Sequence, residues 1–186
     1  RVVGILGALG QTDAQFLTAS RMTGKDLKDV AATRAVTPAE WHTRVSTYYK
    51  VMPDEMKARW AAGLRAAYAP DQAAVAALND KDFDHLLAAL RGLGDKAIPS
   101  LVASRVTAVH LKDAASARAA GLNQWSQYVA QCAAVLSDEA KAQWAAKLRE
   151  AFVAPEQLKK LNDDDFARLL GALPGLGVKE IGRAHV

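Results

Sequence analysis

This chain of 186 residues lacks a second cysteine and any long apolar run. It has a single cysteine, Cys132, so no disulfide can form within it, which argues against a disulfide-stabilised secreted scaffold. No stretch approaches about 18 uninterrupted apolar residues, so the sequence predicts no transmembrane segment. Localisation stays unknown, because the chain begins at Arg1 and we expect the true N-terminus to lie upstream.

The chain also has little excess of one sign of charge over the other. The formal net charge is +4, but residues 11–94 and 95–177 each carry an excess of only one positive charge, and the rest comes from the two ends. Neither segment has the basic run or stripe that would neutralise phosphates, so we predict no nucleic-acid partner. Lysines and acidic residues are intermixed, which also disfavours a helical protein that binds a lipid surface.

Aromatic residues make up 6% of the chain, and runs of β-branched residues are missing. Alanine, the strongest helix former, accounts for much of the hydrophobic content. Apolar residues recur with a helical period; for example, Trp41, Val45 and Met52 fall on one helix face. The sequence therefore predicts an all-α fold without strands.

The chain contains an internal repeat of about 84 residues. Trp41-x3-Val45 recurs as Trp125-x3-Val129. Two longer segments recur as well: 54–65 as 138–149, and 78–83 as 161–166 after the loss of one residue. Nearly all the retained positions are helix caps or apolar packing positions. We predict a tandem helical repeat, arranged either as a solenoid or as two stacked helical bundles.

The repeat also predicts the boundaries of the units. Gly10 aligns with Gly94 and Gly177, so unit 1 spans 11–94 and unit 2 spans 95–177. Residues 1–10 align with the tail of a preceding unit, and 178–186 with the start of a further one, as expected for a fragment of a longer array. Residues 181–186 back-translate, with permitted codons, into a common sequencing adapter, so we interpret them as an artefact and exclude them from fold and site reasoning.

Start and stop signals predict five or six helices per unit. Thr37-Pro38-x-Glu40 combines a capping hydroxyl, a first-turn proline and a glutamate three residues after the cap. Asn79 or Asp80 caps a later helix, which we expect to end at Gly92-Leu93-Gly94.

Two motifs resemble ligand-binding loops, and both are disfavoured. Residues 1–10, with Asp29 downstream, resemble a dinucleotide-binding turn, but the spacing is GxxGxxG and the repeat aligns the segment with a helix end. Asp80-x-Asp82-x-Asp84 resembles the start of a calcium loop, yet it lacks the glycine and the glutamate that such a loop needs.

Isolated reactive residues also have a structural interpretation. His42, His85 and His110 have no histidine counterparts and no partners at ligand spacing. Cys132 takes the place of Tyr48 on an apolar helix face, where a buried, inert thiol is expected. We predict no catalytic residue, no metal site and no cofactor.

Two sets of repeated side chains remain as candidate sites. The tryptophans Trp41, Trp60, Trp125 and Trp144 are favoured as core residues, with a partner-binding groove as the alternative. The arginines Arg21, Arg34, Arg105 and Arg118 form a possible anion site; a structural ion pair from Arg21 to Asp29 is the simpler interpretation.

These observations favour a non-enzymatic α-helical repeat that acts as a protein-interaction or structural module, with another protein as its partner. The alternative is a small-ligand or anion-binding protein, or an enzyme, with a pocket between the two units. Whether the protein is an enzyme stays open at this point, as do its oligomeric state, its partner and the number of repeats.

Overall fold

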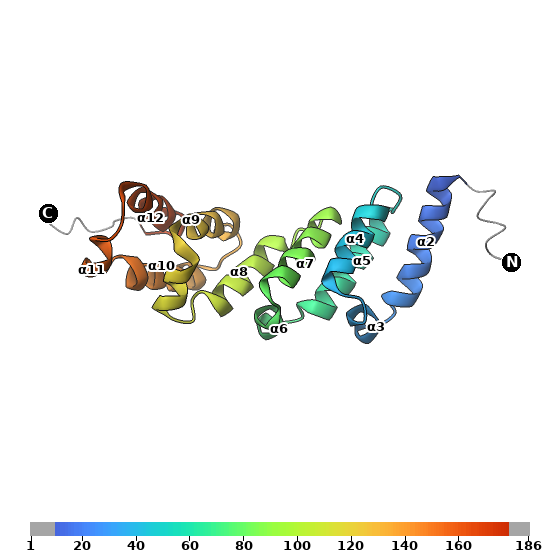
Figure 1. Cartoon of the computed structure of the whole chain (residues 1–186), viewed down its shortest axis with the longest axis horizontal. Helices are drawn as coiled ribbons and strands as arrows, with labels where there is room; N and C mark the ends of the chain where they lie inside the picture. Colours follow the sequence, from blue (N-terminus) through green and yellow to red (C-terminus); the bar gives the residue numbers. More distant parts are fainter. Residues whose placement is uncertain (1–9, 179–186) are drawn as a thin grey trace. The chain divides into compact units, whose positions relative to one another are not determined.

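A computed structural model describes residues 10–178 of the chain. Within this range the only regular elements are α-helices, and the all-α prediction is confirmed. The helices are α2 (Gln11–Asp26), α3 (Val30–Arg34), α4 (Pro38–Tyr48), α5 (Asp54–Tyr68), α6 (Gln72–Ala77), α7 (Asp80–Gly92), α8 (Ile98–Val109), α9 (Ala114–Cys132), α10 (Asp138–Phe152), α11 (Pro155–Leu158) and α12 (Asp163–Gly175) (Figure 1). The predictions for 1–9 and 179–186, including the adapter at 181–186, lie outside the described residues.

Contacts divide the chain into two compact units. Unit 1 ends at Ile98 and unit 2 begins at Pro99, whereas the sequence repeat places its boundary at Gly94. Each unit buries its own set of large side chains. In unit 1 the largest are Trp41, Trp60, Leu64, Leu86, Leu90, Val45 and Val75; in unit 2 they are Trp125, Trp144, Leu148, Leu169 and Leu173.

In unit 1, α4 packs against α7, and α5 packs against α3 and α7 (Figure 1). α4 begins behind the predicted capping box: Thr37 Oγ1 accepts from the amide of Glu40, and the Glu40 carboxylate accepts from the amide of Thr37. Gly92 lets α7 approach α4, because a Cβ there would lie 2.8 Å from Val45 Cγ1. A local cap therefore fixes where α4 begins, and a glycine allows α4 and α7 to pack closely.

In unit 2, α9 packs against α12 and α10. α9 covers the sequence that unit 1 divides between α3 and α4, and it bends at Gly121, whose φ is +74°. Gly121 and Leu122 replace the capping threonine and the proline of unit 1, so the stop and restart predicted from unit 1 become a kink. Gly175 repeats the close approach, with Val129 Cγ1 2.7 Å from a Cβ placed there.

The last helix of each unit ends at a glycine in the left-handed region. Gly94 has a φ of +73° and Gly177 a φ of +80°, a conformation that glycine adopts without a Cβ penalty. After α7, the amide of Asp95 donates back to Leu90 O at 3.0 Å, and the corresponding bond follows α12. The predicted glycine helix ends are confirmed.

Candidate functional site

In unit 1, Trp41 and Trp60 are fully buried and meet edge to face, with ring centroids 5.2 Å apart. The sequence repeat aligns each of these residues of unit 1 with a matched residue of unit 2. The indole Nε1 of Trp41 donates to Thr33 O at 3.1 Å, and that of Trp60 donates to Thr23 Oγ1 at 2.6 Å. Both indole donors are satisfied inside the core.

Unit 2 has the same contacts at the matched positions. Trp125 and Trp144 are fully buried, with centroids 5.6 Å apart. Trp125 Nε1 donates to Ala117 O at 2.8 Å, and Trp144 Nε1 donates to Thr107 Oγ1 at 3.1 Å. Because no ring has exposed surface, the tryptophans support the core interpretation and offer no contact area to a partner.

The four arginines of the possible anion site lie in different environments. Arg34 Nε donates to Ala67 O at 2.5 Å, and Arg118 Nη1 lies 3.5 Å from Ala151 O, so each points at the C-terminal end of a neighbouring helix. Arg105 is buried, whereas its matched residue Arg21 is exposed. These contacts give Arg34 and Arg118 a structural role.

The structure brings together two histidines that the sequence left isolated. The rings of His42 and His85 stack with centroids 5.8 Å apart, and His85 Nδ1 is buried without a hydrogen-bond partner. The pair depends on the packing of α4 against α7, which spacing along the sequence does not reveal. Two rings are too few for a metal site, and residues 10–178 contain no group of three or more potential ligands.

The other candidates from the sequence have structural partners. Cys132 Sγ donates to Pro99 O at 3.4 Å, and burial raises the pKa of this thiol to about 11, so the nucleophilic thiolate is scarce at neutral pH. Asn79 caps α7 by accepting from the amide of Asp82, within the segment that resembles a calcium loop. Asp29 caps α3 and lies 3.9 Å from Lys28 Nζ; this carboxylate is thus engaged near its own helix.

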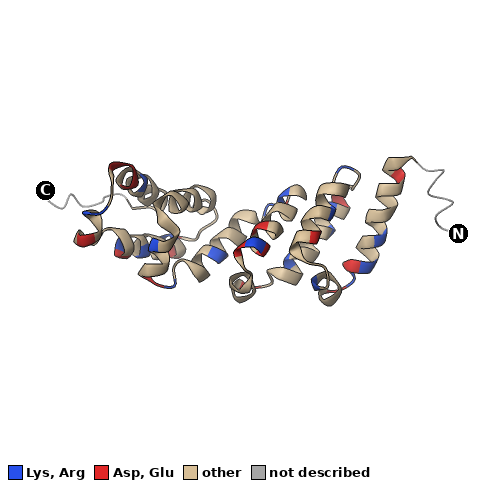
Figure 2. Cartoon of the chain, viewed as in Figure 1, with Lys and Arg blue, Asp and Glu red and all other residues tan. Residues whose placement is uncertain are grey.

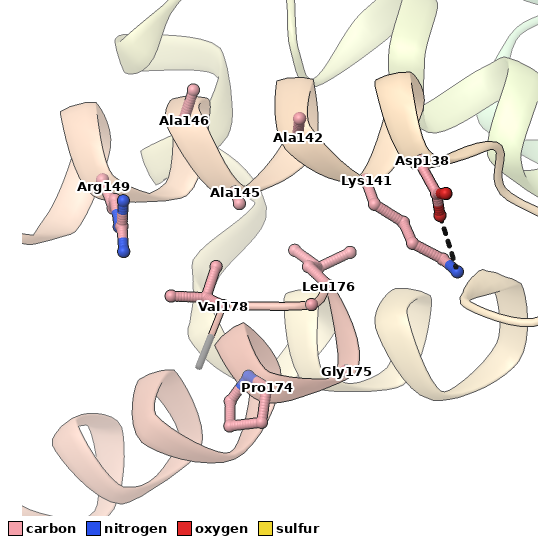
Figure 3. Close-up of a pocket in the computed structure, with 11 residues that line it drawn as sticks. Asp138, Lys141, Ala142, Ala145, Ala146, Arg149, Pro174, Gly175, Leu176 and Val178 are labelled. Atoms are coloured by element: carbon pink, nitrogen blue, oxygen red, sulfur yellow. Dashed lines mark ion pairs between the residues drawn. The ribbon is translucent and has the colours of Figure 1, made fainter. Parts of the chain in front are cut away.

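A pocket lies at the same place in the sequence of both units. In unit 1 it lies between α5 and the end of α7 and has a volume of about 690 Å³; in unit 2 it lies between α10 and the end of α12, with about 720 Å³ (Figure 3). We call these the α5–α7 pocket and the α10–α12 pocket. Five matched positions on α5 and α10 line them: Asp54, Lys57, Ala58, Ala61 and Arg65, which recur as Asp138, Lys141, Ala142, Ala145 and Arg149.

Each pocket has one more cationic than acidic side chain in its wall. In the α10–α12 pocket, Lys141 and Arg149 project from α10 on either side of Leu176 and Val178 (Figure 3). Lys141 Nζ lies 3.8 Å from the exposed carboxylate of Asp138, and the matched pair in unit 1 is 3.0 Å apart. Such exposed ion pairs contribute little and can rearrange.

The two pockets differ at one wall. In the α5–α7 pocket, Arg65 Nη1 pairs at 3.1 Å with Asp95, a nearly buried carboxylate whose Oδ2 has no hydrogen-bond partner. The matched position in the α10–α12 pocket is Val178. Unit 2 therefore presents no carboxylate there.

No protein-family model, curated protein or solved structure matches this chain. Its function must therefore be argued from the pockets, the surfaces and the core contacts alone. Lys and Arg lie beside Asp and Glu along the helices of each unit (Figure 2). Among residues 10–178, no helix is both long enough and apolar enough to cross a membrane.

Proposed function

We propose that this chain is a non-enzymatic module of tandem α-helical units, and that its pockets bind acidic segments of another protein. The recurrence of one pocket in both halves of the chain, with the same lysine, alanine and arginine positions, carries the proposal. Copies of an interaction unit along one chain would present the same contact surface repeatedly.

The chemistry of the pocket walls favours an acidic segment of a protein. Ala58 and Ala142 are exposed and small, so they leave room for the side chains of a partner. Lys141 and Arg149 flank this space in unit 2, and an acidic partner would complement them.

The non-enzymatic part of the proposal rests on what the repeated side chains contact. The matched tryptophans, their hydrogen-bond partners and the matched glycines all serve packing between helices. The one thiol, Cys132, is held protonated at neutral pH by its burial. Packing thus accounts for the retained tryptophans, threonines and glycines.

The proposal can be tested with a library of displayed peptides panned against the whole chain. The variants Ala58→Glu and Ala142→Glu fill the matched pockets from exposed helix positions and place a negative charge there. Ala130→Glu places the same side chain on an exposed site of α9, outside both pockets, and serves as the matched control. We expect enriched peptides to be acidic and to lose affinity about tenfold or more with A142E, which is about 1.4 kcal/mol, but not with A130E.

Enriched peptides that bind A58E and A142E as well as the unaltered chain would contradict the proposal. Titration with inorganic phosphate separates it from the anion-binding alternative. A thermal midpoint raised by phosphate, and no longer raised in Arg118→Ala, would favour that alternative; we expect no such shift.

A further inference from the structure

Two helices expose side chains whose matched residues in the other unit are buried. On α12, Phe166 and Leu170 are 44% and 38% exposed, whereas the matched Phe83 and Leu87 on α7 are only 7% and 9% exposed. These residues are four apart on their helices, so each pair forms one apolar patch. We call Phe166 and Leu170 the α12 face.

The first described helix shows the reverse relation. On α2, Leu17 is 47% exposed and Arg21 is also exposed, whereas the matched Leu101 and Arg105 on α8 are only 8% and 7% exposed. Phe16 beside them is 38% exposed. We call Phe16, Leu17 and Arg21 the α2 face.

Phe166, Leu170 and Leu17 therefore occupy positions that are buried in the other unit, and Phe16, whose matched Ser100 is exposed, extends the apolar area beside Leu17. A large apolar side chain exposed singly needs no explanation, but neighbouring exposed ones indicate an interface when the matched positions are buried. A buried arginine such as Arg105 also requires a partner for its charge. The exposed Arg21 is thus expected to find one when the α2 face is covered.

We propose that the α12 face of one copy of this chain docks on the α2 face of a second copy. Charge favours this pairing over a symmetric one. The first turn of α12 carries Asp163, Asp164 and Asp165, whereas α2 carries Asp13 in its first turn and Arg21 and Lys25 nearer its C-terminal end. Antiparallel docking of α12 on α2 brings the three carboxylates beside the two cations. A symmetric contact of α12 with α12 offers them only Arg168, which already pairs with Asp165 of its own helix at 3.1 Å.

The pairing is heterologous, because each copy uses a different face at each contact. Such contacts leave one free face of each kind on every dimer, so copies add head to tail as the concentration rises. The inference rests on the tandem-unit part of the proposed function and is independent of the pockets. Loss of self-association would leave the peptide-binding result unchanged, and the reverse also holds.

Sedimentation velocity of the whole chain over a concentration series up to about 1 mM tests the pairing. Leu17→Asp blocks the α2 face and Leu170→Asp blocks the α12 face, both at exposed positions that leave the core intact. Val135→Asp is the control, because Val135 is 46% exposed and lies outside both faces. Circular dichroism verifies that each variant is folded.

We expect the unaltered chain and V135D to gain mass with concentration, and L17D and L170D to remain monomeric when measured alone. Mixed in equal amounts, the two blocked variants should form dimers that grow no further, because each retains the face that the other lacks. A chain that is monomeric at every concentration would overturn the proposal. Self-association of L17D or L170D alone, comparable to that of V135D, would also overturn it, because it requires a symmetric contact.

Discussion

Units 1 and 2 place different pairs of side chains at the same two matched positions beside a tryptophan. In unit 1, Arg44 pairs with Asp26 at 2.8 Å and lies over the ring of Trp41. The matched residues of unit 2 are Tyr128 and His110, whose rings stack with centroids 5.5 Å apart. An ion pair in one unit is thus an aromatic pair in the other. The position requires two side chains that fill the same space beside a tryptophan, and it tolerates a change of charge.

The tryptophans, in contrast, are the same residues in both units, and their indole N–H groups donate to the same kinds of acceptor. Each unit uses one indole to reach a backbone carbonyl and the other to reach a threonine hydroxyl. The comparison therefore separates positions where only the shape is fixed from positions where the side chain itself is fixed. Four measurements test this distinction.

The largest effect is expected from removing a matched tryptophan. Trp60→Ala and Trp144→Ala each empty a fully buried site and leave a threonine hydroxyl without its donor. We expect each to lower the free energy of unfolding of its own unit by about 3–5 kcal/mol. Urea titrations followed by hydrogen exchange in each unit measure this loss. A cost below about 1 kcal/mol for either variant would contradict the packing role of that tryptophan.

The matched glycines should give the next largest effect. Gly92→Ala and Gly175→Ala place a Cβ less than 3 Å from a valine methyl across the helix interface, and we expect a loss of about 1–3 kcal/mol each. Gly24→Ala and Gly171→Ala are the controls, because a Cβ there meets nothing within 4 Å. These helical controls should instead stabilise the chain by up to about 1 kcal/mol.

The same urea titrations measure the change in the free energy of unfolding, which should be a loss for G92A and G175A and a gain for their controls. If G92A and G175A were as stable as their controls, the helix pairs would not pack as closely as the structure places them.

Exchanging the Asp26–Arg44 pair for the aromatic pair of unit 2 tests the idea of a shape-determined position. We expect Asp26→His and Arg44→Tyr to cost about 1–2 kcal/mol singly, and the double variant to recover at least half of the summed loss. A double-mutant cycle in urea measures the recovery. Strictly additive losses would mean that the two positions do not act as one contact.

The smallest effect concerns the capping box, which among residues 10–178 occurs only at the start of α4. The hydrogen bonds from Thr37, the backbone amide first, lower the pKa of Glu40 below its ordinary value of 4.5. A carboxyl whose pKa is lower in the folded state stabilises it above the ordinary pKa, and this contribution is lost as the pH falls through the folded value. We therefore expect acidification to weaken the start of α4, with Gln124 at the matched position of unit 2 insensitive to pH.

Hydrogen exchange of the Thr37 amide between neutral pH and about pH 3, corrected for the intrinsic pH dependence of exchange, measures this loss. Glu40→Gln is the control and should remove the dependence. Equal protection of Thr37 at both ends of the range would contradict the assignment of Glu40 as its partner.

Much of the helical structure follows from local patterns in the sequence. The capping box at Thr37, the cap at Asn79 and the glycine end at Gly94 depend on neighbouring residues, so they can be predicted without knowing the fold. The burial of the tryptophans follows from the helical period of the apolar residues. Local patterns are less informative at Gly121. Unit 1 has a threonine and a proline at the matched positions and starts a helix there, whereas unit 2 lacks both and α9 continues through a kink.

The features that the sequence did not predict depend on contacts between helices. The His42–His85 stack requires α4 beside α7, and the pairing of Arg65 with Asp95 requires α5 beside the end of α7. The pockets arise in the same way, from the approach of helix ends to a face lined with alanine. No spacing within a single helix encodes them. The repeat, however, could have identified their walls in advance, since it aligns the lining residues.

Hydrogen exchange of the four tryptophan indole N–H groups in the free chain, followed by NMR, tests whether the repeated side chains of both units are retained for packing. Buried indoles that donate to Thr23, Thr33, Thr107 and Ala117 should all be strongly protected, and the matched indoles should show similar protection. Any indole that exchanges as fast as free tryptophan, or matched indoles with very different protection, would contradict the claim that the repeated side chains of both units are retained for packing.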